Sequence, residues 1–238
     1  MKNWLIGTAA AVSAGLVSGG AWALDIAWVH SNAAAQSEQR VKAGIEAWLQ
    51  ETGKSDWNIT FLDSGGSGEQ TASNLQDAAS RGVDAIIITM ADLRASRAAL
   101  DAAIAADIPI FSVDSGYVDG VVVDVTTNNW AMSADVSPYL LDQLGGQGNL
   151  IFLRMAEHHG TRKRGDVMEK VLKEYPDVKV LAEHNIDYTA FFEDTSRTME
   201  DYASRFGSDI DAVWAPWDEP AQAAINALSA AGITDVKV

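Results

Sequence analysis

Short apolar runs alternate along the chain with longer stretches in which apolar residues recur at helical spacing. The clearest case is the segment 82–117, in which the run DAIIIT is followed by an Ala-rich stretch and then by the run IPIFSV. Strands that alternate with helices in this way build parallel sheets. The run at 84–89 is too apolar for a half-exposed strand, which predicts that helices cover it on both faces. The pattern therefore predicts an α/β fold.

The same alternation continues over the rest of the chain. Strands are expected at 25–30, 58–63, 84–89, 108–113, 121–125, 149–154, 178–183 and 211–216, with another beginning at 235–238, and helices at 35–51, 69–81, 93–106, 130–144, 162–174, 190–206 and 219–231. A break near 126–129 leaves about 100 residues on each side, a usual domain size. We expect two Rossmann-like lobes with parallel sheets flanked by helices, an N-terminal lobe over 24–127 and a C-terminal lobe over 128–238. Because the chain stops in an expected strand, we expect the second lobe to be incomplete at the C-terminus.

The first residues have the features of a secretory signal peptide. Lys2 is the only charged residue before Asp25, residues 4–17 form an apolar run that is too short to span a bilayer well, and Ala-Trp-Ala ends at Ala23. We expect a signal peptide over 1–23 that is cleaved after Ala23. The chain has no cysteine, so an exported protein of this sequence depends on its core rather than on disulfides.

The chain is strongly acidic, with a formal net charge of −16 at pH 7. Such a charge repels polyanions, which argues against binding to nucleic acid or to anionic lipid. An acidic, solvated surface is sufficient to explain the charge, so we do not infer a cationic ligand from it.

Motifs for catalysis or cofactor binding are weak. The GGSG segment at 65–68 precedes an expected helix, but it lacks the GxGxxG and GxxxxGK[ST] patterns, and a flexible loop is the simpler interpretation. Glu157, His158 and His159 are adjacent, and adjacent side chains usually point apart rather than toward one metal ion. There is no GxSxG segment, and Ser115 has no evident histidine partner. We therefore expect neither an enzyme nor a cofactor nor a resident metal.

A set of polar and aromatic residues stands just past the expected strand ends. In open parallel sheets, ligands bind beyond the carboxyl ends of the strands. Carboxylate, amide and guanidinium groups bind neighbouring hydroxyls, and aromatic faces stack on sugar rings, so the set favours a neutral polyhydroxylated ligand. Structural roles are the alternative, because Asp92 could cap a helix, Trp217 could pack in the core and Arg162 could pair with a surface acid. The candidate ligand-binding residues are Ser31, Asn32, Asp92, Asp114, Arg162, Tyr188, Trp217 and Asp218.

Several segments resemble, in order and spacing, the periplasmic sugar-binding proteins of ABC importers, the ribose-binding-like group with the type I periplasmic binding fold. GVDAIIITMAD is similar to that group's vDaIi…P.D segment, IPIFSVDS to its IPVvtvD strand, and TTNNWAMS to the tDN…aG crossover into the second lobe. GGQGNLIFL, RKRGDVMEKVLKEYPDVKVLAE and WAPWDEPAQAAINALSAAGI resemble later segments of the group. The resemblance covers 25–238. It implies a periplasmic protein whose lobes close on a small ligand and deliver it to a membrane permease. We also expect a monomer, although the sequence does not indicate the oligomeric state.

The resemblance also implies ligand contacts, with several departures. The implied contacts are Ser31 and Asn32 at the end of the first strand, Asp92 as the loop acid, Arg162 with Arg164 as the second arginine, Tyr188 with Phe191 and Phe192 as shifted alternatives, and Trp217 in place of an amide. The group's Asn-Pro-Phe-Phe is Asn-Ala-Ala-Ala at 32–35, which removes two stacking aromatics, and the arginine after the loop acid is Leu93. Trp217 could restore a stacking surface from the other lobe. We expect a monosaccharide or sugar alcohol that is not bound as ribose is.

Other functions use the same lobes. A subunit that presents a bound small molecule to a membrane sensor or chemoreceptor is not distinguished from an import protein by this sequence. An exported α/β enzyme would need a nucleophile–base pair or a metal set, and neither is evident. A gene regulator of the same shape would carry a basic DNA-binding helix pair where the expected signal peptide stands.

Overall fold

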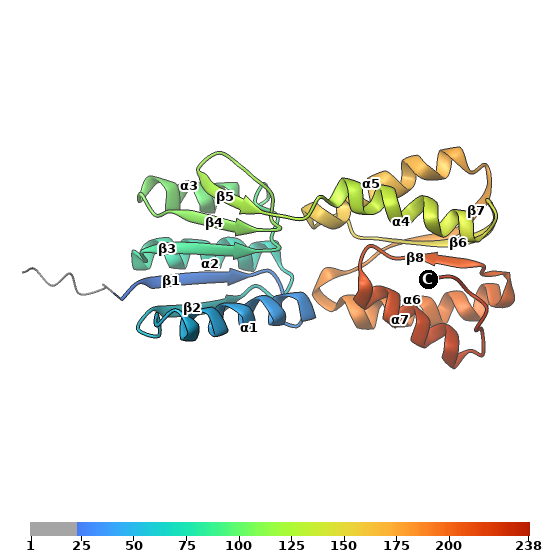
Figure 1. Cartoon of the computed structure of the whole chain (residues 1–238), viewed down its shortest axis with the longest axis horizontal. Coiled ribbons are helices and arrows are strands. Elements are labelled where there is room, and N and C mark those ends of the chain that lie inside the picture. Colours follow the sequence, from blue (N-terminus) through green and yellow to red (C-terminus); the bar gives the residue numbers. More distant parts are fainter. Residues whose placement is uncertain (1–22) are drawn as a thin grey trace, which may run out of the picture.

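Two parallel sheets follow one another along the long axis of the molecule in the computed structural model, which describes residues 23–238 (Figure 1). The predicted signal peptide, apart from Ala23, lies outside the described residues. The strand orders are β2-β1-β3-β4-β5 and β7-β6-β8, and all strand pairs are parallel. This arrangement confirms the predicted α/β class.

The first sheet is covered mainly on one face. Its strands are β1 (Asp25–His30), β2 (Asn58–Asp63), β3 (Ala85–Thr89), β4 (Ile110–Val113) and β5 (Val121–Val125), and its helices are α1 (Gln36–Glu51), α2 (Gly68–Arg81) and α3 (Arg97–Ala105). Leu75 of α2 and Leu100 of α3 pack against Ile86 and Ile88 of β3 in one core cluster. On the other face, α1 reaches β1 and β2, where Lys42 lies over the ring of Phe61 at 4.4 Å.

The second sheet lies between two pairs of helices. Its strands are β6 (Gln147–Arg154), β7 (Asp177–Asn185) and β8 (Ala212–Trp214), and its helices are α4 (Asn129–Gln143), α5 (His159–Val171), α6 (Phe191–Phe206) and α7 (Asp218–Ala230). Phe152 of β6 packs with Leu141 of α4 and Met168 of α5, whereas Leu153 packs with Met199 of α6. Alternate residues of one strand therefore pack into two cores.

No helix in the described part of the chain has the length and apolar character needed to cross a membrane.

The helix boundaries follow from local hydrogen bonds. Ser67 caps α2 by accepting the Gln70 N–H, and Gly82 ends the helix in the left-handed conformation, with φ of 65°. The structure starts α3 at Arg97 rather than at the predicted 93. The reason is that the Asp92 carboxylate accepts the N–H groups of Arg94 and Ala95 and holds 93–96 in turns.

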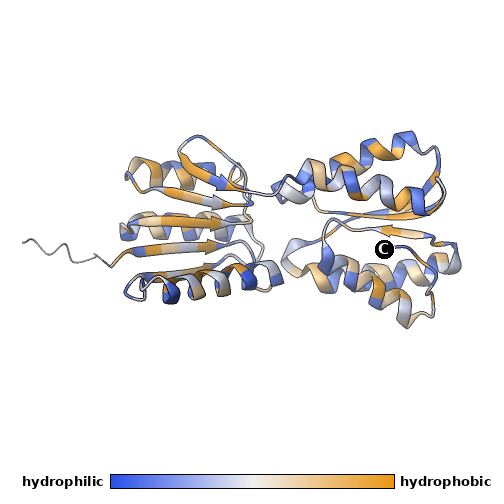
Figure 2. Ribbon diagram, viewed as in Figure 1, coloured by the Kyte–Doolittle hydropathy of each residue, from blue (hydrophilic) through white to orange (hydrophobic). Residues whose placement is uncertain are grey.

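Two other expectations about the sheets are corrected. The segment 235–238 is not a strand in the structure, because only Lys237 forms a bridge, to Ala212 beside β8. The predicted covering of β3 on both faces is also incomplete. On the face that carries the partly buried Ile87, the neighbouring Phe111 and Val123 are 36% and 43% exposed. Figure 2 shows these strands as mainly hydrophobic, so their apolar composition exceeds their burial.

Candidate functional site

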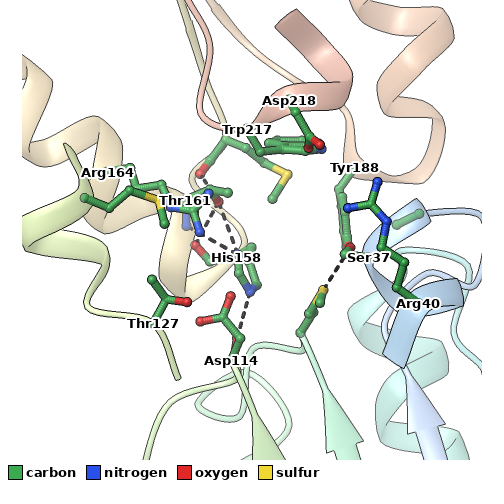
Figure 3. Close-up of a pocket in the computed structure, with 14 residues that line it drawn as sticks. Ser37, Arg40, Asp114, Thr127, His158, Thr161, Arg164, Tyr188, Trp217 and Asp218 are labelled. Carbon is green, nitrogen blue, oxygen red and sulfur yellow. Dashed lines mark hydrogen bonds between the residues drawn. The ribbon is translucent and has the colours of Figure 1, made fainter. Parts of the chain in front are cut away.

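The carboxyl ends of the two sheets face each other (Figure 1). A cavity of about 440 Å³ lies between them and is lined from both lobes (Figure 3). It is the main cavity of the candidate site. The chain order reverses beside β1 in the first sheet and beside β6 in the second, because each of these strands lies between the next two strands of its series. Such switch points leave a crevice beyond the strand ends, where ligands bind in open α/β sheets. Within the described residues, the chain passes from one sheet to the other at 126–128, and Thr127 lines the cavity.

Two arginines line this cavity, the exposed Arg40 of α1 and the partly buried Arg164 of α5. Arg164 is the one held by protein groups on the second lobe. Its Nε donates to Asn129 Oδ1 at 2.7 Å, and its Nη1 donates to the Pro216 carbonyl at 2.8 Å. A guanidinium has five N–H donors, so three remain for a ligand. Burial lowers the pKa of Arg164, while the charges of Asp114 and Asp218 act in the opposite direction. The two bonds to protein groups hold the guanidinium in place before any ligand binds.

Asp114 is the carboxylate at the end of β4. Its Oδ1 accepts from the Thr126 hydroxyl at 2.6 Å and from Asn129 Nδ2 at 3.2 Å, so Asn129 joins Asp114 to Arg164. Asp114 and Met90, which follow neighbouring strands and both line the cavity, have positive φ values of 47° and 54°. Such conformations are uncommon outside glycine and cluster at functional sites. They turn the chain sharply at the cavity wall.

Aromatic side chains form the wall that the second sheet contributes. The Trp217 ring lies 5.7 Å from Phe191 and 6.5 Å from Tyr188, both edge to face. Trp217 and Tyr188 line the cavity, with Asp218 next to them (Figure 3). Burial raises the pKa of the Tyr188 phenol, so it is neutral and can donate a hydrogen bond.

Seven of the eight predicted site residues fall into three places, and Arg162 lies in a fourth. The main cavity is lined by Asp114, Tyr188, Trp217 and Asp218. A smaller neighbouring cavity of about 240 Å³ is lined by Ser31, Asp92 and again Tyr188. Asn32 is buried, and its Nδ2 donates to the Tyr188 carbonyl at 2.9 Å, which joins the end of β1 to the second lobe.

Arg162 and Asp92 pair with each other rather than pointing into the main cavity. Arg162 Nη1 lies 3.6 Å from Asp92 Oδ2 and donates to the Ala156 carbonyl at 2.9 Å. Both side chains are partly exposed and line a third cavity. The pair therefore bridges the two lobes outside the main cavity.

Several cavity residues were not among the eight candidate ligand-binding residues. They are Ala35, Ser37, Arg40, Met90, Thr127, Met132, Met155, His158, Thr161 and Arg164. Arg164 had a signal, as the second arginine of the Arg-x-Arg-Gly segment, and His158 entered the sequence analysis only as a weak metal ligand. The side chains of Met90, Met132 and Met155 are apolar, and no feature of the neighbouring residues predicted that they line the cavity. Within residues 23–238, no group of three or more metal-ligating side chains converges.

A buried polar network lies beneath the end of β1. Glu38 of α1 is 0% exposed, and its carboxylate accepts from the Ser31 N–H at 3.1 Å and from the Thr89 hydroxyl at 2.6 Å. The same carboxylate lies 3.1 Å from His30 Nδ1, and the His30 ring stacks on Trp28. Glu38 therefore fixes the backbone at the point where β1 leads into the site.

We expect Glu38→Ala to lower the free energy of unfolding by about 3 kcal/mol, because it leaves buried donors without an acceptor. Urea unfolding followed by circular dichroism measures the change. Glu46→Ala is the matched control on the same helix, since Glu46 is 52% exposed and pairs with Lys42 at 3.9 Å, and its loss should be below about 0.5 kcal/mol. Equal losses in the two variants would contradict a structural role for the Glu38 network.

The fold and the cavity define a class of two-lobed α/β binding proteins. More specifically, the chain belongs to the periplasmic binding protein domain family, whose model matches residues 26–238. It is 30% identical over 169 residues to a xylitol-binding protein of Mycolicibacterium smegmatis, covering 70% of this chain and 48% of that one. It is 29% identical over 191 residues to the ribose import binding protein of Escherichia coli, covering 79% and 63%. The chain thus spans about half to two thirds of the length of these curated relatives.

Solved structures have the same fold. An ABC sugar transporter subunit from Rhodobacter sphaeroides aligns with a TM-score of 0.79 and 25% identity, covering 90% of this chain and 76% of that one. A solute binding protein from Agrobacterium vitis with bound allitol aligns with a TM-score of 0.80 and 23% identity, covering 90% and 74%. The relatives named here are binding proteins or transporter subunits.

Proposed function

We propose that the protein binds a monosaccharide or sugar alcohol in the main cavity and is not an enzyme. The observation that supports this proposal most directly is that Arg164, Asp114 and Trp217 converge on this cavity from the two lobes. A guanidinium with free donors and a carboxylate with a free oxygen pair with adjacent hydroxyls, and the indole covers the apolar face of a ring or carbon chain. The relatives named for xylitol and ribose support the same ligand class.

The proposed mechanism is closure of the two lobes on the ligand, with no bond made or broken. Ligand contacts from both lobes favour the closed arrangement over the open one. We further propose that the closed protein, after export to the periplasm as a monomer, delivers its ligand to an ABC transporter permease. Family membership and the relative named for ribose import support this step.

A thermal-shift screen tests the ligand class. The panel contains xylitol, ribose, allitol, other pentoses, hexoses and alditols, amino acids, and divalent metals with a chelator control. A ligand at 100 times its Kd stabilises the folded state by about 2.7 kcal/mol, which corresponds to a rise in Tm of about 5 to 10 °C for a protein of this size. We expect such a rise with a sugar or alditol. A rise with amino acids or metals alone, or with no compound at all, would contradict the proposed ligand class.

The delivery step has a separate test. Deleting the gene in its host should abolish uptake of the radiolabelled sugar or alditol that the screen identifies, and the wild-type gene should restore it. Undiminished uptake in the deletion strain would contradict delivery to a permease and leave the binding proposal intact.

A further inference from the structure

His158 stands where the two lobes meet the cavity. It is 6% exposed, lies at the N-terminal cap of α5 and lines both the main cavity and its smaller neighbour. Its Nδ1 accepts the Thr161 N–H at 3.3 Å, within its own lobe. Its Nε2 lies 2.9 Å from the Asp114 carbonyl oxygen, which belongs to the other lobe (Figure 3).

These partners determine the state of the ring. A backbone N–H can only donate, so the nitrogen that faces Thr161 must be bare. A carbonyl oxygen can only accept, so the nitrogen that faces Asp114 must carry the proton. Neutral imidazole with hydrogen on Nε2 is the one form that satisfies both contacts, and burial lowers the pKa of His158 in agreement with this.

Capping alone does not explain a histidine at this position. Serine, threonine, aspartate and asparagine are the preferred capping residues. A threonine hydroxyl could accept the Thr161 N–H, but its side chain is too short to donate across the lobes to Asp114 as well. What the imidazole adds is this second contact, made to a residue whose backbone has a φ of 47°.

We propose that His158 is a positioning residue that couples the ligand cavity to the closed arrangement of the lobes. It holds the Asp114 backbone from the opposite lobe, so that the Asp114 carboxylate faces the ligand only when the lobes are together. The proposal rests on the proposed function, since it assigns His158 a role in the same ligand site.

The contact should also respond to acid. The titratable groups that adjoin His158 or line the smaller cavity with it are Asp92 and Asp114 from the first lobe, and Glu157, His159, Arg164 and Tyr188 from the second. Protonated Nδ1 would face the Thr161 N–H with a second donor, so the closed form binds fewer protons than a form in which His158 is exposed to water. Because burial lowers the pKa of His158, the stabilisation that the neutral ring gives the closed form is fully present above about pH 6.5 and is lost as the pH falls through the lowered pKa.

Three variants separate the two contacts. The His158→Thr variant keeps a capping oxygen and loses the bond to Asp114. His158→Gln keeps an N–H donor at the reach of Nε2. His159→Gln controls for the neighbouring histidine, whose pKa is also lowered by burial. Ligand dissociation is measured by stopped flow with the sugar or alditol from the screen, between pH 5 and 8.

We expect His158→Thr to dissociate about tenfold faster than the wild type at pH 7.5, in line with one lost hydrogen bond, and His158→Gln to stay within about threefold. The wild type and His159→Gln should lose affinity below about pH 6.5, whereas the two His158 variants should show a flatter profile. Wild-type dissociation and pH dependence in His158→Thr would overturn the proposal.

A ligand-free measurement distinguishes failure of this proposal from failure of the proposed function. In ¹⁵N-labelled protein without ligand, we expect the His158 imidazole to carry its proton on Nε2, because the Thr161 N–H faces Nδ1 within the same lobe whether the lobes are open or closed. An imidazole with the proton on Nδ1 would overturn the role of His158 even if a sugar binds. Binding failure in the screen alone would overturn the ligand class.

Discussion

Arg164→Ala is expected to lower the affinity for the sugar or alditol identified by the screen by at least about 100-fold. Hydrogen bonds to charged groups contribute about 1.5 to 3 kcal/mol each, and a guanidinium with three free donors can make more than one to a ligand. The substitution also leaves the carboxylates of Asp114 and Asp218 in the cavity without their cation. Isothermal titration calorimetry measures the change in Kd.

Arg162→Ala is the matched control, two residues earlier on α5. Arg162 pairs with Asp92 at 3.6 Å outside the main cavity, and a partly exposed pair of this kind contributes about 1 kcal/mol or less, so we expect a loss of less than about fivefold. Arg164→Lys keeps a positive charge without the planar fork and should fall between the wild type and Arg164→Ala. Equal losses in Arg162→Ala and Arg164→Ala would contradict the placement of the ligand beside Arg164.

Gly66→Ala is expected to weaken ligand binding about 30-fold by keeping the lobes apart. A Cβ on Gly66 would lie 2.9 Å from Thr189 Cα and 2.9 Å from the Tyr188 carbonyl oxygen, across the interface. Both are backbone atoms, which cannot rotate away as a side chain can. The lobes must therefore separate slightly, and the contacts that close the cavity lengthen. Calorimetry and small-angle scattering of the ligand-bound protein measure the affinity and the separation.

Gly65→Ala is the control for backbone strain. Gly65 and Gly66 both have positive φ, of 54° and 80°, so an alanine is strained at either position. A Cβ on Gly65 meets nothing within 4 Å. Gly65→Ala should therefore lose stability without a loss of affinity above about threefold. A Gly66→Ala variant that binds as tightly as Gly65→Ala would show that close approach of the lobes at this edge is not needed for binding.

The strands and helices could be read from the sequence because their signals are local. The run at 84–89 became β3, and α2 ends at Arg81, where the predicted helix ends. The start of α3 could not be read in the same way, because it depends on which backbone groups the Asp92 carboxylate accepts. The uncovered face beside Phe111 was missed for a related reason, since apolar composition does not say which elements pack on a strand.

The sequence predicted the region of the candidate site, but not which of its side chains line the main cavity. Asp92 and Asp114 both follow apolar strands, yet one forms a turn and pairs with Arg162, whereas the other has a left-handed backbone and lines the main cavity. Their local sequences do not distinguish these roles. Arg162 and Arg164 also stand in similar local sequences, and they differ in the direction in which their side chains leave α5. That direction depends on the residue at which the helix begins.

Within residues 23–238 the two lobes are joined by one crossing, at 126–128, which gives this part of the molecule a pivot at one edge. It leaves from β5, and the loop that holds Gly66 follows β2 at the opposite edge of the sheet. Four strand spacings separate these edges, a lever arm of about 19 Å. A rotation of about 3° about the crossing therefore moves the far edge by about 1 Å, while Thr127 beside the pivot hardly moves. A pair of spin labels at the far edge would report lobe motion with the largest amplitude.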